Sequence, residues 1–92
     1  MRKITAEIVG AFERRESRAK SNTWTDGERL YLFDNLIAEH RDDGIYISLA
    51  GWDTVTTRER LNGIRGAHVH RDKGQTKLNN VPMSDYGFHL VV

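Results

Sequence analysis

The stretch that decides the fold is Ser21–Ala50, "SNTWTDGERLYLFDNLIAEHRDDGIYISLA". Within it Leu30 and Leu32 alternate with Tyr31 and Phe33, which is the two-residue period of a strand with one buried and one exposed face. Turn-forming sequences interrupt the strand-like runs. We therefore predict a four-stranded antiparallel meander, with turns at Asp26-Gly27, at Asp34-Asn35 and within the "RDDG" of residues 41–44.

The Asp26-Gly27 dipeptide predicts the first hairpin of this meander. "SNTWT" and "ERLYLF" flank it as two strand-like runs, and glycine accepts the positive φ that a type I′ turn requires. We therefore expect a type I′ turn between these two strands.

A helix is predicted before this region, over residues 5–16. Thr5 has the hydroxyl of an N-cap, and Glu7 would lie in the first turn, where the helix dipole favours an anion. The opposite face, residues 13–18, is a solvated run of charge. The helix would bury an apolar stripe at helical spacing: Ile4, Ile8, Val9, Ala11 and Phe12.

The segment Ala50–Ile64, "AGWDTVTTRERLNGI", predicts a second helix. Thr56 and Glu59 have the spacing of a capping box, and Asn62-Gly63 is a natural stop. We expect Trp52 to pack beneath this helix as a structural residue. Leu61 and Ile64 would face the sheet.

A functional alternative for the same segment is an anion site at the helix N-terminus. In this hypothesis Thr54, Thr57 and Arg58 receive a phosphate or a carboxylate, with Arg60 pointing outward beside them. Any capped helix offers as much, so the structural interpretation is preferred.

The C-terminal third predicts a further hairpin, "AHVH" (67–70) with "TKLNN" (76–80), joined by "RDKG". Pro82 breaks the pattern, and "YGFHLVV" (86–92) is either an edge strand or a docking tail. The predicted fold class is α+β, with two short helices packed on one face of a mostly antiparallel sheet, a four-stranded meander plus a C-terminal hairpin. The length of 92 residues fits a single domain, residues 1–92.

Composition excludes several classes of protein. The net charge is +1, from 14 basic and 13 acidic residues, which excludes a strongly acidic DNA mimic and disfavours a binder of the phosphate backbone. The absence of cysteine excludes disulfides, thiolate metal sites and a cysteine nucleophile. No apolar run reaches the roughly 18 residues of a membrane span, so we expect a soluble intracellular protein.

Few residues suggest metal or catalytic chemistry. His68 and His70 are two apart and would point to the same side of a strand, but a metal site needs a further ligand such as His40 or His89, and the spacing does not identify it. We expect an exposed pair on an edge strand instead. No catalytic triad, carboxylate pair or phosphate loop stands out, so we expect no enzyme activity, no metal and no cofactor.

The aromatic residues favour a partner-binding surface. Trp24, Tyr31, Phe33 and Tyr46 fall on predicted strands, and one sheet face must lack a helix cover. Such a face can stack bases, grip a protein or consist of half-buried sheet residues. The near-neutral charge favours a protein. The alternative is a nucleic-acid-binding protein that uses a basic first helix, together with Arg58 and Arg60. The basic residues assigned to that helix are Arg14, Arg15, Arg18 and Lys20.

Several blocks of the sequence resemble a widespread family of small tailed-bacteriophage proteins, over about residues 1–70. The resemblance is most specific in "TTRERLN", whereas "QTKLNN" departs from the aromatic-rich strand expected there. It implies a phage gene product in the host bacterial cytoplasm and implies no activity. We expect a non-enzymatic module that binds a host protein and inhibits or modulates a defence or metabolic complex, as an anti-CRISPR does; a homodimer remains open. The resembling blocks are Arg2–Thr5, Ser21–Thr23, Leu30–Leu32, Asn35–Ala38, Ala50–Trp52 and Thr56–Asn62.

Overall fold

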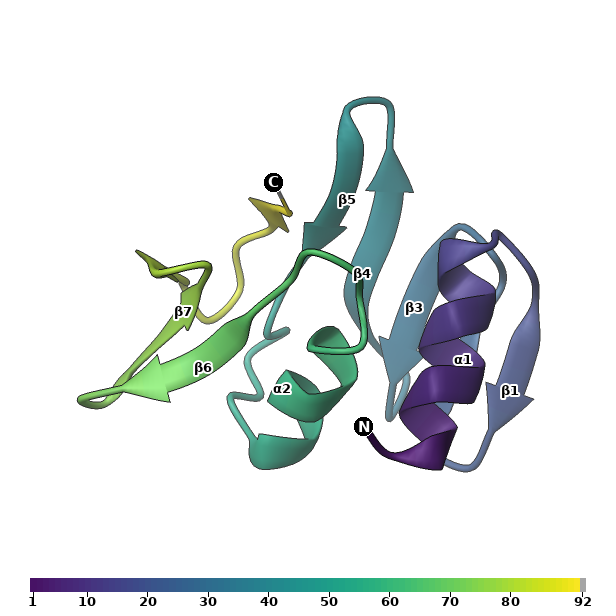
Figure 1. Cartoon of the computed structure of the whole chain (residues 1–92), viewed down its shortest axis with the longest axis horizontal. Coiled ribbons are helices and arrows are strands. Elements are labelled where there is room, and N and C mark those ends of the chain that lie inside the picture. The colour runs from purple at the N-terminus through teal and green to yellow at the C-terminus, as the bar shows by residue number, and fades with distance from the viewer. Residues whose placement is uncertain (92) are drawn as a thin grey trace.

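The computed structural model of the chain describes residues 1–91. It is α+β: a six-stranded antiparallel sheet in the order β1-β2-β3-β4-β5-β9, a three-stranded sheet in the order β6-β7-β8, and two helices. Figure 1 shows both helices on the same side of the larger sheet, as predicted. The elements are α1 (Lys3–Glu13), β1 (Arg18–Lys20), β2 (Thr23–Thr25), β3 (Arg29–Leu32), β4 (Asn35–Arg41), β5 (Gly44–Ile47), α2 (Val55–Leu61), β6 (Val69–Asp72), β7 (Gln75–Leu78), β8 (Val81–Pro82) and β9 (His89–Leu90).

The first helix begins and ends earlier than predicted. Arg2 is its N-cap residue and makes no side-chain cap, so the prediction of Thr5 as N-cap is wrong. At the other end Arg15 adopts a left-handed conformation (φ 60°), and the N–H of Glu16 donates to the carbonyl of Ala11 at 2.8 Å. This is a Schellman motif, which turns the chain back so that it can form β1.

The meander has more strands than predicted. Arg18–Lys20, for which no strand was predicted, forms β1 and pairs with β2, while β9 joins the far edge beside β5. The sheet therefore has six strands instead of four. The "YGFHLVV" segment supplies an edge strand, the first of its two predicted alternatives, although Val92 lies outside the described residues.

The hairpins are confirmed, but the turn type predicted for Asp26-Gly27 occurs at other hairpins instead. At Asp26-Gly27 only Gly27 has positive φ (96°), and the Asp26 carboxylate accepts the N–H groups of Glu28 and Arg29 at 2.9 and 2.8 Å. The turn is therefore not type I′, because that type needs positive φ at both central residues. Two-residue turns that do meet this condition lie at Phe33-Asp34, Lys73-Gly74 and Asn79-Asn80.

The predicted apolar stripe of α1 forms the centre of the core. Ile8, Val9 and Phe12 are fully buried, and Leu61 and Ile64 approach from α2 and the loop that follows it, as predicted. The sheet contributes Leu30, Leu32, Ile37, Ala38 and Ile47 to the same core.

Within residues 1–91 no helix is both long enough and apolar enough to span a membrane.

Candidate functional site

The N-terminus of α2 is capped by Thr54 and not by Thr56. Thr54 has extended backbone angles, and its Oγ1 accepts the N–H of Thr57 at 3.2 Å. Thr56 lies inside the helix, so the predicted Thr56–Glu59 capping box does not form, and the N-cap lies two residues earlier. Its other member, Glu59, is occupied by partners from α1 instead.

Arg60 is buried, which overturns its prediction as an outward-pointing binding residue. Its side chain is only 1% exposed. The guanidinium donates to the Thr23 hydroxyl at 2.9 Å and to the Thr5 hydroxyl at 3.1 Å, and it pairs with Glu59. Asn22 accepts a longer bond of 3.4 Å. Arg60 thus joins α2 to α1 and β2 and is not available to a ligand.

Glu59 completes this polar network. Burial raises the pKa of its carboxyl, but hydrogen bonds from the Thr5 hydroxyl and the Arg2 N–H, together with the Arg60 guanidinium, act more strongly in the opposite direction. The pKa therefore lies below its ordinary value, and Glu59 stays ionised as the counter-charge of buried Arg60.

Arg58 is also occupied. It pairs with Asp53, whose carboxylate accepts a bond of 2.6 Å from Arg71 and another of 2.6 Å from the Thr76 hydroxyl. Burial raises the pKa of Asp53, but these donors lower it by more, so the net pKa lies below the ordinary value. Because Thr57 is also buried, these residues do not form the predicted anion site. They tie the start of α2 to the three-stranded sheet.

Trp52 points outward, contrary to the prediction that it packs beneath α2. It is 60% exposed. Ala50 and Gly51 both have positive φ (53° and 79°), and this reversal gives the buried position to Leu49, whose carbonyl accepts the N–H of Trp52 at 2.8 Å. Glycine suits position 51, where φ is positive and a Cβ would lie 2.6 Å from the ring of Tyr86.

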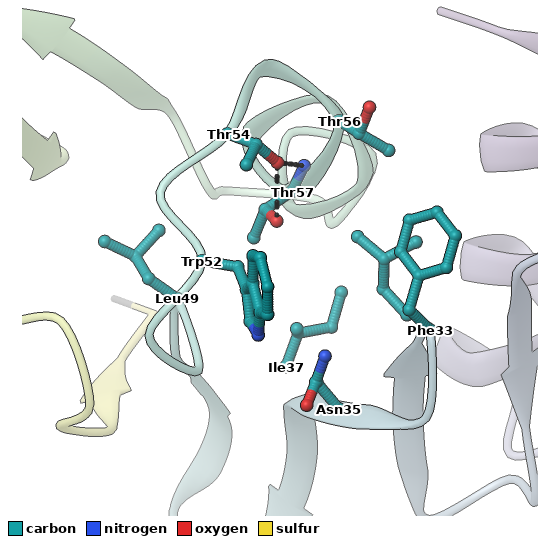
Figure 2. A pocket seen from close by; sticks show the side chains of 9 residues that line it. Phe33, Asn35, Ile37, Leu49, Trp52, Thr54, Thr56 and Thr57 are labelled. Carbon is teal, nitrogen blue, oxygen red and sulfur yellow. Dashed lines mark hydrogen bonds between the residues drawn. The ribbon is translucent and has the colours of Figure 1, made fainter.

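A pocket of about 430 Å³ opens beside Trp52. Figure 2 shows Trp52 and Phe33 on opposite sides of it, with Thr54 and Thr56 along one edge and Asn35 toward the other. Phe33 is 66% exposed because it lies in the turn between β3 and β4, although the sequence predicted a strand position. Aliphatic side chains from the core form the floor of this Phe33–Trp52 pocket: Leu32, Ile37 and Leu49.

The open face of the six-stranded sheet presents a second aromatic surface. Trp24 and Tyr31 stack across β2 and β3 with ring centroids 4.1 Å apart. The Arg41 guanidinium lies 4.1 Å from the centre of the Tyr46 ring and 5.1 Å from that of Phe88. The strand positions predicted for Trp24, Tyr31 and Tyr46 are confirmed, and these three rings are only half exposed.

The predicted basic helix is not formed by the residues assigned to it. Because α1 ends at Glu13, Arg14 caps it and Arg15 and Arg18 follow it. All three are exposed, and each lies within 3.0 Å of a carboxylate, with Glu16, Glu28 and Glu7 as the respective partners. The basic charge here is balanced locally.

His68 and His70 lie together as predicted, but only His70 is on a strand, because β6 begins at Val69 and His68 precedes it. Their ring centroids are 4.9 Å apart, and β6 is an edge strand of its sheet. His68 is exposed and His70 is half-buried, with an Nδ1 that has no hydrogen-bond partner. No cluster of three or more histidine, aspartate or glutamate side chains able to hold a metal occurs within residues 1–91.

Sequence reasoning missed the pocket because its residues come from two separate turns. Phe33 comes from the β3–β4 turn and Asn35 from the first position of β4, whereas Leu49 and Trp52 come from the reversal before α2. The Gly51 that follows Ala50 was the available indication of a left-handed reversal there.

Comparison with known proteins identifies one family. A family model described as Kyanoviridae Gp96 protein matches residues 1–87. No curated protein and no solved structure gives a significant match.

Proposed function

The chain belongs to the Kyanoviridae Gp96 protein family, a family of phage proteins, and on this premise we propose that it is a non-enzymatic module that binds a host protein through the Phe33–Trp52 pocket. The proposed setting is the cytoplasm of the host bacterium. The proposed consequence is inhibition or modulation of a host defence or metabolic complex.

The observation that carries this proposal is the exposure of Trp52 beside an apolar pocket. Tryptophan is the residue type most enriched at the energetic centres of protein interfaces. Here it is 60% exposed, and Phe33, on the other side of the pocket, is 66% exposed. Solvent exposure of two large aromatic side chains around a hollow is unfavourable in the free protein, and a partner that covers them recovers that free energy.

A nucleic-acid partner has less support. The nucleic-acid hypothesis relied on Arg58 and Arg60. Arg58 is paired with Asp53, and Arg60 is buried. The other three arginines of that hypothesis, Arg14, Arg15 and Arg18, are each paired with a glutamate. Such binding would weaken steeply as salt rises, and this dependence separates it from a protein contact made by aromatic side chains.

The test is affinity capture from lysate of the host, with matched variants. Trp52→Ala removes one exposed wall of the pocket, and Phe33→Asn removes the other wall while keeping a residue type that tolerates a left-handed turn. Val81→Ala is the control, because Val81 is equally exposed (62%) and does not line this pocket.

We expect the wild type and Val81→Ala to retain one stoichiometric host protein at high salt, and both pocket variants to lose it. Capture of the same protein by Trp52→Ala at undiminished yield would overturn the proposal. Recovery of nucleic acid that is released by salt would favour the alternative.

A further inference from the structure

The walls of the Phe33–Trp52 pocket carry no ionisable side chain. Its nine lining residues are aliphatic, aromatic, threonine or asparagine. In a chain of which 29% is charged, this sets the pocket apart from the clefts lined by Arg58 and Glu59 or by Glu13 and Arg14. A charged group placed in it would lose water without gaining an ionic partner, so the pocket selects an uncharged occupant.

The charges nearest in sequence to the pocket are already engaged. Asp34, next to Phe33, accepts the indole N–H of Trp24 at 3.0 Å. Asp53, next to Trp52, is held by Arg58, Arg71 and Thr76. At the start of α2, Thr54 already accepts the N–H of Thr57. Because none of the nine lining residues is charged, the electrostatic complement of the pocket itself is neutral.

The shape of the pocket favours an aromatic group. Its volume of about 430 Å³ suits a group of the size of one large side chain with room for adjoining atoms. Trp52 and Phe33 lie on opposite sides of it, so a ring that enters the pocket has an aromatic side chain on either side (Figure 2). Aromatic pairs gain free energy beyond the area that they bury, whereas an aliphatic group gains only the latter.

Polar groups at the edge of the pocket suit a peptide backbone. In Figure 2 the indole nitrogen of Trp52 lies on the side of the ring toward Asn35, whose amide can both donate and accept. The Thr54 and Thr56 hydroxyls lie along the other edge. A backbone amide has one donor and one acceptor, so it can pair with these groups once its side chain has entered the pocket.

We propose that the pocket receives one uncharged aromatic side chain of the partner protein, with the adjoining backbone amides held by the Trp52 indole N–H and the Asn35 amide. This inference rests on the proposed function and specifies the chemistry of the partner at the same site. It predicts that the partner's contact segment carries a phenylalanine, tyrosine or tryptophan without a carboxylate beside it.

The experiment titrates the ¹⁵N-labelled full-length protein with three probes, followed by two-dimensional NMR. N-acetyl-phenylalaninamide carries the proposed side chain between two amides. N-acetyl-phenylalanine has the same ring and a carboxylate, and N-acetyl-leucinamide has an aliphatic side chain of similar size. Each titration is repeated with Trp52→Ala and with Val81→Ala.

We expect saturable shifts at pocket residues with N-acetyl-phenylalaninamide, unchanged in Val81→Ala and abolished in Trp52→Ala. The leucine probe should bind about 2- to 10-fold more weakly, the fold-change that corresponds to an aromatic pair. The carboxylate probe should bind at least about tenfold more weakly, because its charge is desolvated without a partner.

Equal affinity for the carboxylate probe, tighter binding of the leucine probe, or shifts confined to residues outside the pocket would each overturn the inference. The two proposals fail separately. Selective probe binding without capture of any host protein refutes the proposed function and supports the chemistry of the pocket. Capture that depends on Trp52 without selectivity among the probes refutes only the inference about the aromatic side chain.

Discussion

Replacement of Arg60 by alanine is the sharpest test of how this protein is held together. The side chain is 1% exposed and donates to Thr23, Thr5 and Glu59, which belong to three different parts of the core. After its removal the Thr5 hydroxyl still donates to Glu59, and the Thr23 hydroxyl still donates to Asn22 at 2.7 Å. The principal losses are the counter-charge of the Glu59 carboxylate and the packing of a long buried side chain.

The expected cost follows from these losses. Removal of one partner of a buried ion pair costs about 3–5 kcal/mol, because the other charge is left in a poor solvent. Glu59 is 23% exposed and can recover some hydration, so we expect the lower end, about 3 kcal/mol. A domain of this size has a free energy of unfolding of about 5–14 kcal/mol. The variant should therefore fold but melt about 12–24 °C lower than the wild type.

Urea denaturation followed by circular dichroism measures this cost, and Arg14→Ala is the matched control. Arg14 also pairs with a glutamate, but its side chain is 58% exposed, so its loss should cost less than about 0.5 kcal/mol. If Arg60→Ala is no more destabilising than Arg14→Ala, then Arg60 is a surface residue and the buried network described above is wrong.

Three further predictions concern stability. Trp52→Ala should lower the free energy of unfolding by less than about 1 kcal/mol in a urea titration, because the ring is largely exposed; a loss of 3 kcal/mol would show a core role. Asp53 and Glu59 have pKa values lowered from 3.8 and 4.5, so their contribution to the free energy of unfolding is complete above about pH 4.5 and is lost as pH falls through the lower native pKa values. Asp53→Asn should therefore be less stable than the wild type at pH 7, and its melting temperature should fall less steeply as pH is lowered. Gly63→Ala places a Cβ 2.5 Å from Thr5 Cγ2 between the helices and should cost about 1–3 kcal/mol by calorimetry; an unchanged melting temperature would contradict that packing.

Local patterns predicted the parts of the fold that depend on near neighbours. The alternation of Leu30 and Leu32 with Tyr31 predicted strand faces, and the 3.6-residue stripe containing Ile8 and Phe12 predicted the buried face of α1. The stop at Asn62-Gly63 was also evident. Each of these depends on residues a few positions apart, whose geometry the chain itself imposes.

The ends of elements were less predictable, because competing local partners decide them. Thr56 and Glu59 have the spacing of a capping box, yet Glu59 is bound by Thr5, 54 residues away, and Thr54 caps the helix instead. The Asp26-Gly27 dipeptide predicted a hairpin correctly but the wrong turn type, since the Asp26 carboxylate takes the N–H groups of the loop.

By itself, the sequence determined the fold class, the main strand pairings and the resemblance to a phage family, because periodicity and turn residues act over short distances. Only the tertiary structure decided which polar and aromatic side chains are inside. Arg60 is buried because Thr5 and Thr23, from elements more than 30 residues away, supply acceptors for its charge. Trp52 is exposed because a reversal at Ala50-Gly51 gives the buried position to Leu49. The candidate site exists only because the β3–β4 turn and this reversal pack side by side. Local sequence patterns do not predict a contact between two turns that are distant in the sequence.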